Sequence, residues 1–257
     1  AFVTLAEGQV HLRRIAGEPA ATPLLLFHAS PSSSWGLQGL MQALVAAGHR
    51  GSIVAPDTLG NGDSVAPAPE HPDIAYFADS MRRLADALGH DKVDVYGGHT
   101  GARIACEFAA AFPARVGRVI LDGIMEYDAE FRRLVVENYA PKVEPDEYGR
   151  QLVWAFNFVR DQAHYFPYFM RDPAHRLASA VPDPKVLHRA TLDVLKALDT
   201  YSKPYIAAFE YEAYSRMPLV QAPVLLLRPD AELPVLNAAI ETATRALPRS
   251  QVARVAP

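Results

Sequence analysis

Cysteine, long apolar runs and an excess of basic charge are all scarce in this sequence of 257 residues. The single cysteine, Cys106, excludes a disulfide within these residues, a pattern typical of a cytoplasmic protein. The longest aliphatic runs, such as Leu24-Leu25-Leu26-Phe27, are too short to cross a bilayer. Lys and Arg number 25 against 29 Asp and Glu, so the chain lacks the basic face that binds phosphate backbones. We therefore expect a cytoplasmic protein without nucleic-acid or membrane partners, and its oligomeric state is left open.

Half of the residues are apolar, which is enough for one sizeable hydrophobic core. Short apolar runs bounded by turn residues alternate with longer helix-compatible stretches, and this alternation predicts an α/β sheet built from parallel crossover units. The predicted strands are Val10–Ile15, Pro23–Phe27, Ser52–Ala55, Val93–Tyr96, Val119–Asp122, Val224–Arg228 and Val252–Val255. The predicted helices between them are Gly36–Ala47, Ile74–Leu88, Thr100–Phe112 and Pro234–Leu247.

The alternation stops between residues 126 and 217, where no strand-like aliphatic run occurs. This segment holds 16 of the 24 aromatic residues but only one of the 15 glycines, Gly149. Glycine is needed where the backbone turns tightly or approaches a ligand, so the turns that carry chemistry belong to the rest of the chain. We predict a core formed by residues 1–125 and 218–257, with residues 126–217 inserted as a helical cap.

One strand-to-helix turn has the composition of a nucleophile elbow. Val93–Tyr96 runs into Gly97-Gly98-His99-Thr100-Gly101, which matches the pattern G-x-S-x-G with His99 in the place of serine. Flanking glycines allow the central residue to adopt a strained backbone and to project above the sheet. A shifted register, G-H-T-x-A, would make Thr100 the reactive residue instead. The elbow geometry favours His99, and both residues are candidate catalytic groups.

Two further segments strengthen this interpretation. His28-Ala29-Ser30-Pro31 follows a predicted strand as an oxyanion-hole loop does, and residues 57–64 read D-x-x-G-x-G-x-S. With the elbow, these motifs occur in an order that resembles the α/β-hydrolase family, and the resemblance covers the core on both sides of the cap. It implies a doubly wound, mostly parallel sheet with a capped pocket above the elbow. It also implies that the N–H groups of Ala29 and Thr100 hold an oxyanion.

The sequence departs from the family pattern in two places. An imidazole at His99 is a good base and a poor substitute for an acyl-accepting hydroxyl, so ordinary serine esterase chemistry is not expected. The family's general-base histidine follows the last strand, whereas the last histidine here is His188. Two alternatives remain open: the native chain continues past Pro257 and supplies that histidine, or the chemistry does not use it.

The catalytic acid predicted from the resemblance is Asp230. It follows a predicted strand and stands four residues before Pro234, as in the family's D-x-x-x-P turn. Glu126 and Asp128 are alternative acids. A carboxylate beside His99 would fix the tautomer of the imidazole and make it a positioned base.

Four residues are candidate substrate contacts. His28 and Ser30 belong to the oxyanion loop, where His28 braces the loop or meets the substrate. In the cap, Trp154 and Phe158 are candidates for the cavity roof, which favours an apolar or aromatic small substrate.

The sequence therefore indicates an enzyme that hydrolyses a small ester, lactone or related carbonyl compound without cofactor or metal. Two alternatives stay open. A lyase could use His99 as its base, because a base and an oxyanion hole also suit bond cleavage by proton removal. An inactive protein that binds a ligand in the capped cavity would also explain the absent serine.

Overall fold

A computed structural model describes residues 1–230 and 232–256. Within these residues the strands are β1 (Phe2–Leu5), β2 (Gly8–Ile15), β3 (Leu24–Phe27), β4 (Ile53–Pro56), β5 (Val93–Gly98), β6 (Val116–Asp122), β7 (Val224–Pro229) and β8 (Ser250–Val255). They form one sheet in the order β1-β2-β4-β3-β5-β6-β7-β8. β2 pairs antiparallel with both β1 and β4, and all the other neighbours are parallel. The predicted mostly parallel sheet is confirmed.

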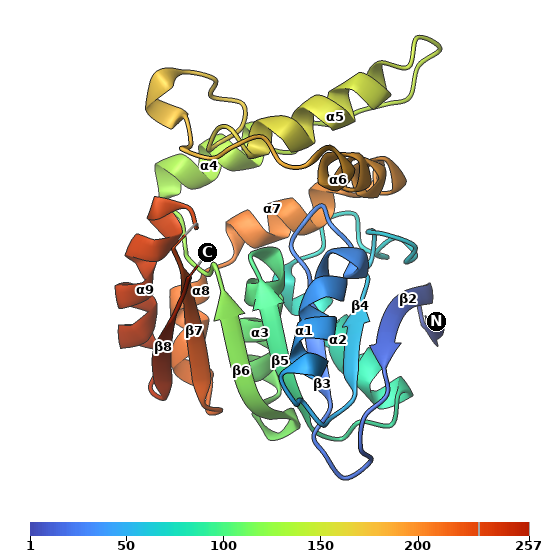
Figure 1. Ribbon diagram of the computed structural model, residues 1–257, viewed down its shortest axis with the longest axis vertical. Helices are drawn as coiled ribbons and strands as arrows, with labels where there is room; N and C mark the ends of the chain where they lie inside the picture. The colour runs from blue at the N-terminus through green and yellow to red at the C-terminus, as the bar shows by residue number, and fades with distance from the viewer. Residues whose placement is uncertain (231, 257) are drawn as a thin grey trace.

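Helices cover both faces of this sheet (Figure 1). The flanking helices are α1 (Gln38–Ala46), α2 (Ile74–Ala87), α3 (Thr100–Ala111) and α9 (Pro234–Ala246). Because side chains alternate along a strand, Leu24 and Leu26 of β3 pack with Met41 of α1 on one face. Leu25 and Phe27 pack on the other face in a cluster that includes residues of α2 and α3. This explains why β3 is an unbroken apolar run, since a central parallel strand is buried on both faces.

The observed elements differ from the predicted ones mainly at their ends. The edge strand β1 was not predicted from the sequence; its pairing with β2 forms it, and its Phe2 is exposed. The predicted helix Gly36–Ala47 begins as a 3₁₀ turn, η1 (Ser34–Leu37), before α1. β6 starts at Val116, three residues earlier than predicted, because it pairs there with Val93 of β5.

The segment between β6 and β7 is helical and contributes no strand to the sheet. Its helices are α4 (Ala129–Asn138), α5 (Arg150–Gln162), α6 (Pro184–Lys196), α7 (Ser202–Glu210) and α8 (Ala213–Arg216). Figure 1 shows α4, α5 and α6 above the end of the sheet to which β5 and β6 point. Aromatic residues from these helices form a hydrophobic cluster of their own. Ala213 and Met217, at the end of the predicted cap, pack in the same hydrophobic cluster as the sheet. The predicted boundary between cap and core at residue 217 therefore stays a prediction.

An ion pair fastens the β1–β2 turn to α2. Arg83 donates to both carboxylate oxygens of Glu7, at 2.6 and 2.7 Å, and this bond lowers the pKa of Glu7 to about 2. We expect Glu7→Gln to lower the free energy of unfolding by about 2 kcal/mol at pH 7. The ordinary pKa of 4.5 applies in the unfolded chain, so the stabilisation is complete above that pH. It is lost as the pH falls toward 2.

Urea unfolding of the wild type and Glu7→Gln at pH 7 and pH 4 measures this effect. The free energies of unfolding of the wild type and Glu7→Gln should differ by about 1 kcal/mol less at pH 4 than at pH 7. The exposed pair of Glu18 with Arg50 offers a matched control, and Glu18→Gln should change stability by less than about 0.5 kcal/mol. A difference that is the same at both pH values would contradict the assignment.

Candidate active site

The turn between β5 and α3 holds His99 in a strained conformation. Its φ is 50° and its ψ is −106°, and among the described residues no other non-glycine residue has a positive φ. Such a conformation costs roughly 1–3 kcal/mol and persists only where the surroundings enforce it. The N–H of His99 donates to the carbonyl oxygen of Asp122 at 2.8 Å, which joins the turn to the end of β6.

Close backbone packing at this turn requires glycine on both sides of His99. A Cβ atom at Gly97 would lie 2.0 Å from the carbonyl oxygen of Gly101. A Cβ atom at Gly101 would lie 2.1 Å from the carbonyl oxygen of Phe27, at the end of β3. The glycines therefore let the start of α3 approach the strands closely enough to bring Thr100 next to the loop that follows β3.

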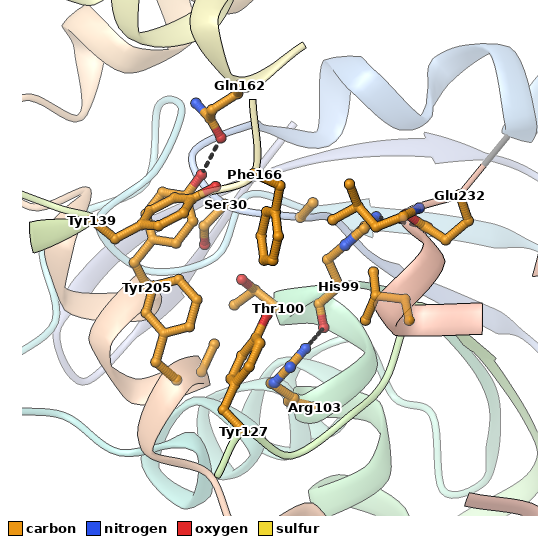
Figure 2. Close-up of a pocket in the computed structure, with 15 residues that line it drawn as sticks. Ser30, His99, Thr100, Arg103, Tyr127, Tyr139, Gln162, Phe166, Tyr205 and Glu232 are labelled. Atoms are coloured by element: carbon orange, nitrogen blue, oxygen red, sulfur yellow. Dashed lines mark hydrogen bonds and ion pairs between the residues drawn. The ribbon is translucent and has the colours of Figure 1, made fainter. Parts of the chain in front are cut away.

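A cavity of about 310 Å³ lies above the elbow and beneath the helical segment. Figure 2 shows His99 at its edge, with the ring extending toward Glu232. The core contributes the loop after β3, the start of α3 and the segment before α9, whereas the helical segment contributes aromatic side chains. The lining residues are Ala29, Ser30, His99, Thr100, Arg103, Tyr127, Tyr139, Gln162, Phe166, Tyr205, Ala208, Phe209, Glu232, Leu233 and Leu236.

The carboxylate beside His99 belongs to Glu232. Its Oε2 lies 3.3 Å from Nε2 of His99, and its Oε1 accepts a hydrogen bond from the N–H of Leu233 at 2.7 Å. Burial opposes ionisation of Glu232, but the contact with His99 outweighs it and lowers the pKa of this carboxyl. A Glu232 carboxylate at Nε2 favours the tautomer with the proton on that nitrogen. Nδ1 lies beside Gly123, 3.2 Å from where a Cβ atom would stand there, and it has no hydrogen-bond partner among residues 1–230 and 232–256.

The predicted pairing of Asp230 with His99 is wrong. Asp230 accepts a hydrogen bond from Nε of Arg254 at 2.6 Å, its N–H donates to Val255, and it does not line the cavity. These bonds turn Asp230 toward β8, and Glu232 is the carboxylate that reaches the elbow. The available sequence signal was an acidic residue just before Pro234, where a helix N-terminus favours negative charge.

The alternative acids also lie elsewhere. Glu126 accepts hydrogen bonds from Arg132 and from the N–H of Tyr214. Asp128 accepts from the N–H of Phe131 and caps α4. Neither residue lines the cavity, because each is committed to organising the start of the helical segment.

Ala29 and Thr100, the two residues predicted to hold an oxyanion, both belong to the cavity wall. Both line the cavity, and neither main-chain N–H has a hydrogen-bond acceptor among the described residues. Thr100 is the first residue of α3, where the N–H groups carry the positive end of the helix dipole. The oxyanion hole at these two N–H groups therefore stays a prediction.

His28 braces the oxyanion loop and does not line the cavity. It is 2% exposed, its Nε2 accepts from the N–H of Thr58 at 2.9 Å, and its Nδ1 lies 2.8 Å from the carbonyl oxygen of Ala29. Burial lowers the pKa of His28, so the ring is neutral and Nδ1 carries the donated proton. The prediction that His28 contacts the substrate is wrong, since Nδ1 is bonded to Ala29, Nε2 is bonded to Thr58 and the buried ring does not line the cavity.

Trp154 and Phe158, the predicted substrate contacts in the cap, do not line the cavity, whereas Ser30 does. Trp154 stacks on Phe158 with 4.8 Å between ring centroids, and Phe158 is fully buried among other aromatic rings. The rings that form the roof are Tyr139, Phe166, Tyr205 and Phe209. Sequence reasoning missed them, along with Tyr127 and Arg103, because composition does not tell which aromatic residues face a cavity.

One trio outside the cavity has metal-ligand residue types. His11, Asp57 and Asp63 bring ligand atoms within 4.8 Å of one another. The carboxylate of Asp57, however, already accepts from the N–H groups of Ser34 and Asp63 and contacts His11. These bonds account for the arrangement, which organises the turn after β4.

A family model described as "alpha/beta hydrolase fold" matches residues 22–256. The chain belongs to the α/β hydrolase family. Over 128 residues this α/β hydrolase is 34% identical to 2-hydroxy-6-oxononadienedioate/2-hydroxy-6-oxononatrienedioate hydrolase of Paraburkholderia xenovorans, covering 48% of this chain and 43% of that protein. Over 108 residues it is 35% identical to an uncharacterized protein of Mycobacterium tuberculosis, Rv2715. This match covers 42% of this chain and 30% of that protein. The match therefore spans less than half of the length of these curated relatives.

Solved structures agree with the fold over nearly the whole chain. A hydrolase from Pseudomonas aeruginosa gives a TM-score of 0.71 at 14% identity, with 99% of this chain and 89% of that chain covered. The enol-lactonase from Burkholderia xenovorans gives a TM-score of 0.68 at 16% identity, with 99% of this chain and 91% of that chain covered. At these identities the likeness concerns the fold, which confirms the resemblance derived from the sequence motifs. None of the described helices of this α/β hydrolase has the length and apolarity that crossing a membrane requires.

Proposed function

We propose that this α/β hydrolase is an enzyme that hydrolyses small ester, lactone or related carbonyl substrates, with His99 as the catalytic base and no cofactor. The observation that carries the proposal is one constellation within the cavity. The His99 ring lies 3.3 Å from Glu232, and both residues line the same cavity as Ala29 and Thr100, whose N–H groups have no acceptor among the described residues. Relatives named as hydrolases support this reaction type, and a cavity of about 310 Å³ suits a small organic molecule.

The proposed reaction has two proton transfers through His99. The free nitrogen of the ring removes a proton from water as the water oxygen attacks the substrate carbonyl. The carbonyl oxygen becomes an oxyanion that accepts hydrogen bonds from Ala29 and Thr100. As the tetrahedral intermediate collapses, the bond to the leaving oxygen breaks and His99 returns its proton to that oxygen. Glu232 stabilises the positive charge that the ring carries between these steps.

Glu232→Gln tests the pairing. The amide keeps the size of the side chain and removes its negative charge, so we expect kcat to fall about tenfold to a hundredfold with little change in KM. Asp230→Asn is the matched control, because this carboxylate is bonded to Arg254 outside the cavity. It should leave kcat within about twofold. Hydrolysis of p-nitrophenyl acetate followed by absorbance gives both constants. Equal losses in the two variants would contradict the role of Glu232.

The site also supports lyase chemistry, because a base and an oxyanion hole are sufficient for proton removal followed by bond cleavage. Turnover in water enriched in oxygen-18 separates the two reactions. Hydrolysis places one heavy oxygen in the acid product, and mass spectrometry should detect it. Product without the heavy oxygen would establish elimination or retro-aldol cleavage in place of hydrolysis. Ligand binding with no turnover of esters, lactones or hydroxy-carbonyl compounds would identify a binding protein.

A further inference from the structure

Gly123 lies against both the ring of His99 and the carboxylate of Glu232. It follows β6 directly and has a φ of 72°, a conformation that residues with a side chain rarely adopt. A Cβ atom at this position would lie 3.2 Å from Cε1 and Nδ1 of His99 and 3.4 Å from Oε2 of Glu232. These are the nearest atoms that such a Cβ would meet, so an added methyl group would press on the His99–Glu232 pair first.

Three hydrogen bonds tie the segment that contains Gly123 to the elbow. The main-chain N–H of His99 donates to the carbonyl oxygen of Asp122 at 2.8 Å. The guanidinium of Arg103, one turn further along α3, donates to the carbonyl oxygens of Gly123 at 3.4 Å and of Met125 at 2.8 Å. The same guanidinium donates to the carbonyl oxygen of His99 at 3.1 Å (Figure 2). One side chain therefore joins the strained residue to the glycine that its ring contacts.

The chemistry of arginine suits this connection. Arg103 is 4% exposed, and its planar guanidinium carries several N–H donors in fixed directions, so it can bind several carbonyl oxygens at once. Within the described part of the chain it makes no ion pair, and its Cζ lies 5.8 Å from the centroid of the Tyr127 ring. Burying a charge is costly, so a guanidinium surrounded by main-chain carbonyls indicates that these carbonyls must be held together.

We propose that Gly123 and Arg103 are positioning residues for the His99–Glu232 pair. Gly123 leaves the space in which the ring and the carboxylate meet, and Arg103 holds Gly123 in place through main-chain carbonyls. This inference rests on the proposed function and adds to it two residues that act through the pair. The elbow alone does not fix the pair, because Glu232 precedes α9 and contacts His99 beside the end of β6. A small displacement weakens the contact, since a carboxylate stabilises an imidazolium best at hydrogen-bond distance.

Gly123→Ala tests the role of the glycine, and Gly89→Ala is its matched control. Gly89 has a φ of 73°, and a Cβ atom there would meet nothing within 4 Å. Both variants therefore carry the same backbone strain, but only Gly123→Ala presses on the pair. Crystal structures should show a longer distance from Nε2 of His99 to Oε2 of Glu232 in Gly123→Ala than in the wild type. The control should leave that distance unchanged.

Hydrolysis of p-nitrophenyl acetate by the same variants gives the kinetic readout. Gly123→Ala should lower kcat about tenfold with KM within about twofold, whereas Gly89→Ala should keep both constants within about twofold. Adding Gly123→Ala to Glu232→Gln should lower kcat by less than about threefold further, because the charge that needs positioning is already absent. A merely structural role for Gly123 would give the full tenfold loss in both backgrounds.

Arg103→Lys tests the other residue. Lysine keeps the positive charge and loses the planar fork, so the distance between His99 and Glu232 should again increase and kcat should fall about tenfold. Arg216→Lys is the matched control, because Arg216 donates two hydrogen bonds to Glu107 and does not line the cavity. It should keep kcat within about twofold.

The crystal structures separate this inference from the proposed function. An unchanged distance between His99 and Glu232 in Gly123→Ala overturns the role of Gly123, and the same result in Arg103→Lys overturns that of Arg103. A longer distance with an unchanged kcat overturns both roles, as do equal losses of kcat in Gly123→Ala and Gly89→Ala. If Gly123→Ala does not fold while Gly89→Ala does, the glycine is structural and its positioning role fails. If the distances increase but the wild type hydrolyses no ester, the positioning of the pair stands and the proposed hydrolysis fails.

Discussion

Replacing His99 by alanine should lower kcat about a thousandfold on any substrate that the enzyme hydrolyses. A positioned base contributes about a hundredfold to ten-thousandfold to such a reaction. In the described residues the cavity is lined by no second histidine that could take over the role. The rate of p-nitrophenyl acetate hydrolysis by the purified variant measures the loss. His188→Ala removes an exposed histidine from α6 and should retain the wild-type rate.

The strain at His99 provides a second, independent readout. Glycine adopts a positive φ without steric cost, so His99→Gly should raise the free energy of unfolding by about 1 kcal/mol while it abolishes turnover. A variant that is more stable and inactive indicates that the strained imidazole is retained for its chemistry. Full activity in His99→Ala would end the proposed mechanism. Unfolding of either variant would show instead that the ring holds the turn together.

Replacing Gly101 by alanine should lower the free energy of unfolding by about 3 kcal/mol, the upper end of overpacking effects. The new Cβ would lie 2.1 Å from the carbonyl oxygen of Phe27, which is backbone and has no side-chain freedom to move aside. The start of α3 must then shift away from β3. Thermal unfolding should show a decrease in Tm of roughly 6–12 °C for a chain of this size.

Gly39 offers a matched control for that substitution. It lies in α1, and a Cβ added there would meet nothing within 4 Å. Gly39→Ala should therefore stabilise the protein by about 0.5 kcal/mol through helix propensity. The displacement in Gly101→Ala should also separate the N–H groups of Thr100 and Ala29 and reduce kcat, whereas Gly39→Ala should not. Similar stabilities for the two variants would show that α3 does not approach β3 this closely.

Local patterns were sufficient for the main elements of the fold. Apolar runs such as Leu24–Phe27 gave the buried strands, because a parallel strand covered on both faces needs apolar side chains at every position. The glycines around His99 indicated the tight turn, since only glycine tolerates the backbone contacts there. The edge strand β1 was missed because its existence depends on pairing with β2 and not on a pattern of its own.

The acid and the cavity roof could not be assigned in this way. Asp230 and Glu232 are two residues apart, and only the bond from Arg254 in β8 determines which carboxylate remains for His99. The direction of each aromatic side chain in residues 126–217 depends on how five helices pack over the sheet. Tyr139 faces the cavity and Trp154 does not, although composition treats them alike.

The order of residues along the chain by itself determined the α/β framework and the glycine-flanked turn that holds His99. Each of these follows from backbone requirements that neighbouring residues reveal: apolar periodicity for strands, and glycine where main chains touch. Only the tertiary structure selected Glu232, committed His28 to bracing and placed Arg103, Tyr127 and Tyr139 in the cavity wall. Those outcomes arise from contacts between segments distant in sequence, where competing partners in three dimensions settle what each side chain binds.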